Sequence, residues 1–168
     1  AEYLLKQSKS ARTITYKISN TSSFFSDIHD RSSWSFYVPS SIEKPKFAYA
    51  SCNGFSSPDL LAKTDEPYLL WDKLLDQHKA EPFSILIMGG DQVYADELWS
   101  KVKELEEWSR LNMNDKMKRK ATKSMIRNLD TFYESLYLKK WSDEQMSLCL
   151  ASIPTVMMWD DHDIFDGW

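Results

Sequence analysis

The feature that most restricts the fold is a pair of short apolar runs, at 47–50 and 83–88, with a helical pattern between them. In the intervening stretch Trp71, Leu74 and Leu75 recur at a spacing of three and four, which predicts an amphipathic helix. A strand, a helix and a strand within this length form a βαβ unit, and hence a parallel sheet with a right-handed crossover. A further apolar run at 153–158 predicts another buried strand, so the sequence predicts an α/β fold.

Two helical patterns lie between the second and third apolar runs. Apolar side chains recur at helical spacing over about 98–108 and again over about 117–136, and residues 112–115 separate the two patterns. The start of the second pattern is rich in lysine and arginine, which we interpret as a solvated face rather than a phosphate-steering patch. A third helix, with Cys149 in the core, is expected before the last strand.

The first part of the chain has the two-residue period of β-structure. Polar and apolar residues alternate over 12–18 and again over 33–38, which predicts two strands. Two prolines flank the linker-like stretch 39–45. We therefore expect a β-rich segment at 1–45, the end of an N-terminal β-module or an edge extension of the main sheet, before a second domain at 46–168.

Composition limits the classes of function. A chain of 168 residues can bury a core, and its net charge of −4 gives no overall electrostatic case for nucleic acid. Two cysteines do not make a disulfide framework, and no apolar run reaches the length of a membrane span. The chain begins without methionine, so we expect a piece of a longer protein. A cytoplasmic location is the default, with export of the full-length protein and the oligomeric state left open.

Each of the three apolar runs is followed by side chains that can bind a metal. Ligands gather at the carboxyl ends of the strands in open α/β sheets, so these three groups are expected to converge. A glycine pair at 89–90 lets the backbone turn sharply at the second of them. The groups are Cys52 with Asn53, Asp91 with Tyr94, and Asp161 with His162.

The acidic stretch 159–168 gives the strongest indication of a metal. It holds four aspartates and a histidine directly after the last apolar run. Carboxylates this close in sequence raise one another's pKa unless a cation lies between them. Asp91 can bridge two cations, Tyr94 can supply a phenolate, and a thiolate from Cys52 suits iron or zinc rather than magnesium. Taken alone, the stretch is also compatible with a solvated acidic turn.

Two motifs give the sequence a resemblance to a known family. The motifs Gly-Asp-Gln-Val-Tyr-Ala-Asp at 90–96 and Pro-Thr-Val-Met-Met-Trp-Asp-Asp-His-Asp-Ile-Phe-Asp-Gly-Trp at 154–168 closely resemble the PhoD-like alkaline phosphatase/phosphodiesterase family. Ser-Cys-Asn at 51–53 is similar to its first motif. This family belongs to the calcineurin-like metallophosphoesterases. The resemblance covers about 46–168 and implies part of a β-sandwich flanked by helices.

The resemblance also implies a dinuclear site and a role for each ligand. Such enzymes hydrolyse phosphate esters with two metals, iron plus calcium in PhoD itself, and zinc or manganese would also suit these ligands. His162 would donate to the phosphate or to the leaving oxygen, and the ester could be a monoester, a diester or a phospholipid. Cys52, Asp91 and Tyr94 would bind the iron-like metal, Asp91 and Asp161 the second metal, and Asn53 and Asp160 are further candidates.

The chain departs from this family in one respect. The family's later metal-binding motifs are missing, and the remaining histidines, His29 and His78, are expected at the surface or at the edge of the core. We therefore expect that the C-terminal part of the domain is absent. The 168-residue chain alone should have little or no activity, although the resemblance implies that the full-length protein is a phosphoesterase.

Two competing interpretations remain. One is a non-catalytic calcium-binding module built on Asp161, Asp163 and Asp166, although Phe165 stands where an EF-hand loop has its third acidic ligand. The other is a structural domain whose aspartates merely cap elements. Neither explains why Cys52, the glycine pair with Asp91, and Tyr94 occur together.

Overall fold

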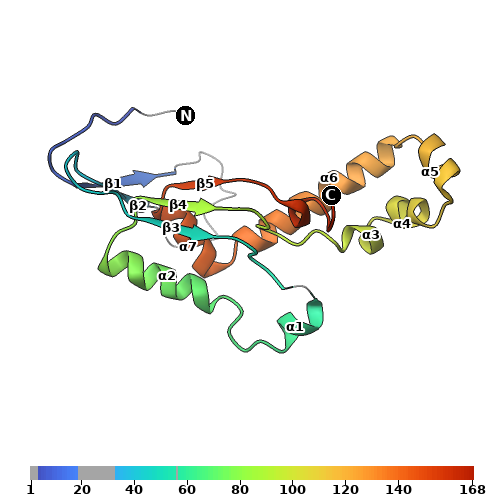
Figure 1. Ribbon diagram of the computed structural model, residues 1–168, viewed down its shortest axis with the longest axis horizontal. Coiled ribbons are helices and arrows are strands. Elements are labelled where there is room, and N and C mark those ends of the chain that lie inside the picture. The colour runs from blue at the N-terminus through green and yellow to red at the C-terminus, as the bar shows by residue number, and fades with distance from the viewer. Residues whose placement is uncertain (1–3, 19–32, 56) are drawn as a thin grey trace. The chain divides into compact units, whose positions relative to one another are not determined.

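The computed structural model describes residues 4–18, 33–55 and 57–168, so His29 lies outside the described residues (Figure 1). The chain divides into two compact units, and each is described by itself. The first unit consists of residues 1–49, 68–87 and 144–156, and the second consists of residues 50–67, 88–143 and 157–168.

A two-stranded antiparallel sheet forms the N-terminal part of the first unit. Its strands are β1 (Arg12–Lys17) and β2 (Ser33–Val38), as the alternating pattern predicts. Tyr16 stacks against Trp34 across the pair, with 5.8 Å between the ring centroids. The hydroxyl of Tyr16 also donates to the backbone carbonyl of Ala151 at 2.8 Å, so this sheet is attached to the core of its unit.

Two helices supply the core of the first unit. They are α2 (Leu69–Ala80) and α7 (Glu144–Ser152), which pack against each other. The predicted apolar face of α2 buries Trp71 and Leu75. Cys149 is fully buried on α7, and its thiol donates to the carbonyl of Trp71 at 3.6 Å. The prediction that Cys149 is a core residue is therefore confirmed.

A three-stranded sheet contains β3 (Phe47–Ala50), β4 (Ile85–Met88) and β5 (Thr155–Met157), with β4 in the middle (Figure 1). The backbone bonds from Ser84 to Lys46 and from Asn53 to Asp91 join residues 38 positions apart in both cases. A constant offset of this kind means that β3 and β4 run parallel, as the predicted βαβ unit requires. The backbone bonds from Leu86 to Pro154 and from Met158 to Met88 join residues 68 and 70 positions apart, so β5 is also parallel to β4 and all three strands end at the same edge of the sheet.

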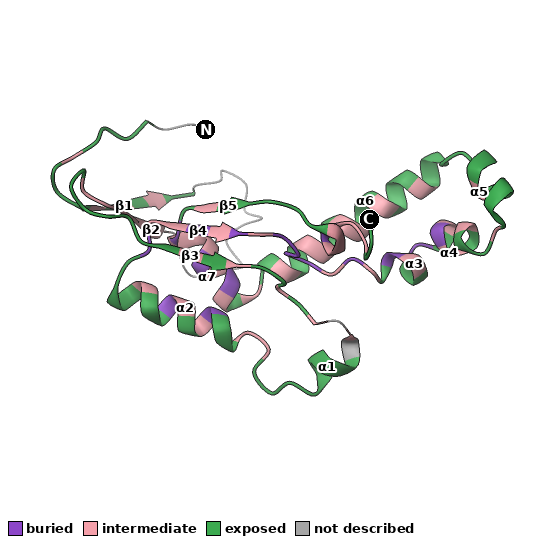
Figure 2. Cartoon of the chain, viewed as in Figure 1, coloured by how far each residue is buried: buried purple, intermediate pink, exposed green. Residues whose placement is uncertain are grey.

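The prediction of a fully buried last strand is wrong. Residues 153–158 form only the short strand β5, and Val156 and Met158 are 57% and 61% exposed (Figure 2). The reason is that β5 is an edge strand of the sheet, whereas β4 between its two neighbours buries Leu86 and Met88 almost completely. An apolar run shows that a strand forms, but its position in the sheet decides how much of it is buried.

The first helical pattern of the second unit gives two helices instead of one. Helix α3 (Leu98–Lys101) ends at Val102, and α4 (Lys103–Ser109) begins directly after it. Val102 has an extended backbone, with φ −99° and ψ 100°, and is only 3% exposed. Its side chain belongs to a buried cluster with Leu98 and Leu105, so core packing overrides the helical periodicity here.

The second pattern is also divided. Helix α5 (Met113–Lys118) is capped by Asn112, whose side chain accepts from the backbone of Asp115. The long helix α6 (Lys123–Trp141) begins anew at Thr122, whose hydroxyl accepts from the backbone of Met125 at 3.1 Å. Side chains of α6 cover the buried cluster of α3 and α4.

Two short helices complete the described part of the chain. They are α1 (Pro58–Ala62), which Ser57 caps, and the 3-10 helix η2 (Asp161–Asp163). None of the helices in the described residues combines the length and the apolar character that crossing a membrane requires.

Candidate metal centre

The segments after β3 and β4 continue side by side beyond the strands. The backbone N–H of Cys52 donates to the carbonyl of Gly90 at 3.2 Å, and that of Asn53 donates to Asp91 at 2.8 Å. The side-chain amide of Asn53 donates to the carbonyl of Gln92 at 3.3 Å. These bonds hold the first and second predicted ligand groups together at one edge of the sheet.

Two non-glycine residues at this edge have a left-handed backbone. Cys52 has φ 55° and Asp91 has φ 54°, a conformation that costs about 1–2 kcal/mol for an L-residue. Strain of this kind persists where the surrounding structure imposes it, and it is concentrated at functional sites. Gly90, at φ 111°, has no room for a side chain, because a Cβ there would lie 2.5 Å from the Cβ of Asp160.

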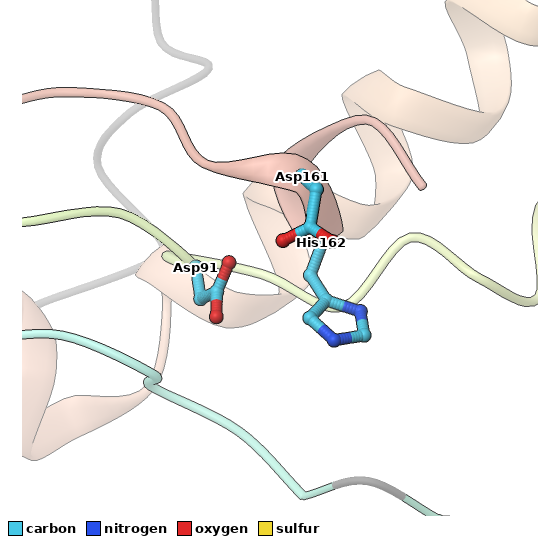
Figure 3. A group of neighbouring side chains, drawn as sticks. All are labelled: Asp91, Asp161 and His162. Atoms are coloured by element: carbon cyan, nitrogen blue, oxygen red, sulfur yellow. The ribbon is translucent and has the colours of Figure 1, made fainter. Parts of the chain in front are cut away.

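Asp91, Asp161 and His162 form one cluster. Each offers a ligand atom, and these atoms all lie within 4.8 Å of one another. Figure 3 shows Asp91 extending from the segment after β4 toward Asp161 and His162, which both belong to η2. Three side chains from two distant parts of the chain thus meet at the edge where the strands end.

The buried carboxylate of Asp91 supports a cation in this cluster. Asp91 is only 7% exposed, and its Oδ1 atom has no hydrogen-bond partner among the residues that the structure describes. A buried acceptor without a donor costs about 1–3 kcal/mol, and more when it is charged. A metal ion satisfies such an oxygen and also neutralises the repulsion between Asp91 and Asp161. The donors in the cluster therefore fit a metal.

Two neighbours orient His162. Its Nδ1 lies 2.8 Å from Oδ2 of Asp96, so Nδ1 carries a proton and donates to this carboxylate. Its ring stacks on Tyr94, with 4.4 Å between the centroids. Burial lowers the pKa of His162, but the hydrogen bond and charge of Asp96, with the charges of Asp91 and Asp161, outweigh burial and raise it. The second oxygen of Asp96 accepts from the backbone of Asp166 at 2.7 Å.

Tyr94 is held against the segment after β3. A Cβ on Gly54 would lie 2.2 Å from the ring of Tyr94, so only glycine leaves room for the ring. Burial raises the pKa of Tyr94, and the charges of Asp91, Cys52 and Asp96 and a hydrogen bond with Cys52 raise it further. In this anionic environment the phenol keeps its proton unless a cation offsets the negative charge.

Asp163 has a structural role rather than a ligand role. It is 3% exposed, and its carboxylate accepts from the backbone N–H groups of Val93 and Asp160, both at 3.1 Å. It also accepts from the hydroxyl of Tyr137 on α6 at 3.2 Å. These three bonds fix η2 to the segment after β4 and to α6, and therefore position Asp161 and His162.

The remaining acidic candidates differ in exposure and in partners. Asp160 is the N-cap of η2, and its side chain accepts from the backbone of Asp161 at 3.0 Å. The carboxylate of Asp161 accepts from the backbone of Gly167 at 2.8 Å, and this bond lowers the pKa of Asp161. One oxygen of Asp160 is therefore engaged in capping, whereas Asp161 belongs to the cluster with Asp91 and His162.

The structure brings only some of the predicted ligand residues together. Asp91, Asp161 and His162 share one cluster, whereas Cys52 lies outside that group and interacts with it through Tyr94. His78 lies in the other unit, where its Nδ1 accepts from the backbone of Phe83 at 3.0 Å.

The sequence interpretation did not assign a supporting role to two acidic residues, one of which, Asp163, it named only as a ligand of the calcium-binding alternative. These are Asp96, which binds His162, and Asp163, which anchors η2. Both lie inside the quoted motifs, so their position was a signal, but the sequence does not distinguish a ligand from a supporting carboxylate.

Comparison with known proteins identifies the family. The model of a family described as PhoD related phosphatase matches residues 7–168. The uncharacterized protein YGR266W of Saccharomyces cerevisiae is 31% identical over an alignment that covers 79% of this chain and 21% of the relative. The chain thus spans about a fifth of the length of that relative, and no solved structure matches the chain. The predicted relationship is confirmed: the chain belongs to the PhoD-related phosphatase family.

Proposed function

We propose that this chain supplies ligands for a dinuclear metal centre that hydrolyses phosphate esters. In this proposal Cys52, Asp91 and Tyr94 bind one metal, Asp91 and Asp161 bind the second, and His162 acts on the substrate. The observation that carries the proposal is the buried oxygen of Asp91, which has no hydrogen-bond partner among the described residues and lies beside Asp161 and His162. The family provides the reaction class, because its members are described as phosphatase-related.

The donor set suggests which metals to expect. A thiolate and a phenolate favour iron or zinc, whereas a site made of carboxylate oxygens favours calcium, magnesium or manganese. We propose iron at the Cys52 side and calcium at the Asp161 side, and zinc and manganese are the alternatives that elemental analysis distinguishes.

In the proposed reaction the cations and the side chains around His162 have different roles. When bound, the cations supply Lewis acidity toward a phosphoryl oxygen and toward water. Asp96 fixes the proton of His162 on Nδ1, which leaves Nε2 to donate to a phosphate oxygen or to the leaving oxygen. The hydrogen bond and charge of Asp96 act to raise the pKa of His162 and favour its protonated form, in which Nε2 also carries a proton. Stacking on Tyr94 restricts the ring to this orientation.

The test is elemental analysis of the full-length natural chain that contains these residues, purified without chelator. Wild type should carry iron or zinc near stoichiometry, and Cys52→Ala should lose most of it. Cys149→Ala is the matched control, because Cys149 is a buried core thiol and should leave the metal content unchanged. If the metal content does not change in Cys52→Ala, Cys52 is not a ligand of the metal.

A second variant tests the cluster itself. Asp91→Asn keeps the volume of the side chain but removes its charge, so both metals and the hydrolysis of p-nitrophenyl phosphate and bis-p-nitrophenyl phosphate should be lost. Full metal content with full activity in Asp91→Asn contradicts the proposal. We further propose that the 168-residue chain alone is inactive, and metal-dependent turnover by that chain would show otherwise.

The calcium-module alternative has less support. It requires Asp163 as a ligand, but all three hydrogen bonds of this buried carboxylate go to protein donors. Asp163 and Asp166 also lie outside the described cluster with Asp91. Calcium affinity that survives Asp91→Ala would favour this alternative again.

A further inference from the structure

The end of the second unit at α5 carries a concentrated positive charge. Residues 112–127 contain six basic side chains and one acidic side chain, so this stretch has a charge of +5 in a chain whose net charge is −4. It consists of α5, the turn that follows, and the first turns of α6 (Figure 1), whereas the residues of and after η2 bond to Tyr133 and Tyr137 farther along α6. The positive charge is therefore segregated on one part of the unit, away from the metal centre.

Most of these cations are not neutralised by neighbours. Arg119 lies 3.8 Å from Glu107, and Lys116 lies over the ring of Trp108 at 5.2 Å. The other four are exposed and form no ion pair within the described part of the chain. These four are Lys118, Lys120, Lys123 and Arg127.

Exposed apolar side chains stand among these cations. Met113 and Met117 are 70% and 81% exposed, and their spacing of four places them on the same side of α5. Ile126, at 50% exposure, is a third apolar side chain within the basic stretch. Basic side chains beside exposed apolar side chains on a helix are a feature of amphipathic segments that lie in a membrane interface.

We propose that residues 112–127 form a docking surface for an anionic phospholipid bilayer. Lys118, Lys120, Lys123 and Arg127 contact the lipid phosphates, while Met113 and Met117 enter the boundary between headgroups and acyl chains. The charge of the surface is complementary to an anionic leaflet, in which each nearby basic residue strengthens binding about five-fold. The proposal does not depend on the metal centre.

Two features favour a bilayer over a nucleic acid. Residues 112–127 contain no Trp, Tyr or Phe, so the surface lacks the aromatic side chains on which unpaired bases stack. A phosphate backbone also offers no apolar surface to Met113 and Met117, whereas a bilayer does. The exposed methionines therefore distinguish the two partners.

The test is cosedimentation of the full-length natural chain with vesicles of phosphatidylcholine that contain 30% or 0% phosphatidylserine, at about 0.1 M salt. Wild type should bind the anionic vesicles and not the neutral ones. Reversal of the four unpaired cations to glutamate should weaken binding at least about 100-fold. The matched control reverses four exposed lysines elsewhere in the chain and should bind within about two-fold of wild type. The control lysines are Lys44, Lys63, Lys73 and Lys101.

Two further measurements complete the test. Met113→Gln with Met117→Gln should weaken binding to the anionic vesicles a few-fold while leaving all charges in place. Absence of binding to anionic vesicles, or an equal loss in the surface variant and the lysine control, would overturn the proposal. It would also be overturned if a single-stranded RNA bound this surface with an affinity that the methionine variant leaves unchanged.

Discussion

Asp163→Asn tests whether one buried carboxylate holds the acidic segment in place. The substitution keeps the size and shape of the side chain but replaces one acceptor oxygen by a donor. The three present donors are the backbone N–H groups of Val93 and Asp160 and the hydroxyl of Tyr137. An asparagine oxygen can serve one side of this arrangement, so at least one donor then faces an NH₂ group.

The expected loss can be estimated from these bonds. A hydrogen bond to a charged group contributes about 1.5–3 kcal/mol, and a buried donor without an acceptor costs about 1–3 kcal/mol. Removing the charge also removes the cost of burying it, which offsets part of the loss. We expect Asp163→Asn to lower the free energy of unfolding by about 2 kcal/mol, a substantial fraction of the 5–15 kcal/mol typical of a folded domain.

Urea unfolding followed by tryptophan fluorescence measures this quantity. Asp130→Asn is the control, because Asp130 is an exposed carboxylate on α6 and should change stability by less than about 0.5 kcal/mol. Tyr137→Phe removes one donor to Asp163, and the double variant should show a coupling of about 0.5 kcal/mol or more with Asp163→Asn. A loss in Asp163→Asn no larger than in Asp130→Asn, or strictly additive effects with Tyr137→Phe, would refute this reasoning.

Three other outcomes follow from the structure. Gly90→Ala should reduce stability and metal content more than Gly167→Ala in thermal unfolding and elemental analysis, because both have positive φ but only Gly90 has a neighbour within reach of a new Cβ. In the proposed phosphate-ester hydrolysis, Asp96→Asn should lower kcat/KM of the full-length natural chain about 10- to 100-fold by loosening His162, and unchanged kinetics would contradict that role. Burial lowers the pKa of His78, so the unfolded chain binds protons more tightly, and stability should fall as pH drops through about 6.5. In urea titrations at pH 7.5 and 5.5, His78→Gln should lose less stability than wild type on this change.

The sequence predicts those parts of the fold that depend on local patterns. The two strands at 12–18 and 33–38 and the strand–helix–strand unit follow from alternation, helical spacing and run length, which act over a few residues. The division of the helices follows from other causes. Val102 fits a helical stripe, and only its packing with Leu98 and Leu105 explains the break. Thr122 is a recognisable cap, and this signal was present in the sequence.

The candidate site shows the same limit. The rule that ligands gather at strand ends predicted that the three groups of candidate residues converge, and the structure brings Asp91, Asp161 and His162 into one cluster but leaves Cys52 outside it. The spacing of the aspartates did not reveal which of them faces Asp91 and which anchors the segment. Asp161 and Asp163 are only two residues apart in the short 3-10 helix, yet they have different hydrogen-bond partners. Asp163 is buried, whereas Asp161 is only partly buried. This difference arises because α6 and the segment after β4 contact Asp163, and both elements are distant from it in sequence.

The long separations along the chain between these partners also determine when the centre can form during synthesis. Asp96 and His162 are 66 positions apart, and Val93 and Asp163 are 70 apart. A nascent chain that has passed residue 96 already contains Cys52, Asp91 and Tyr94 and can close the β3–α2–β4 unit, but its β4 has an unpaired edge. Closing the later, longer loop fixes His162 and Asp161 against residues made much earlier. The proposed metal centre is therefore completed late in synthesis, and the edge of β4 stays unpaired until β5 has been made.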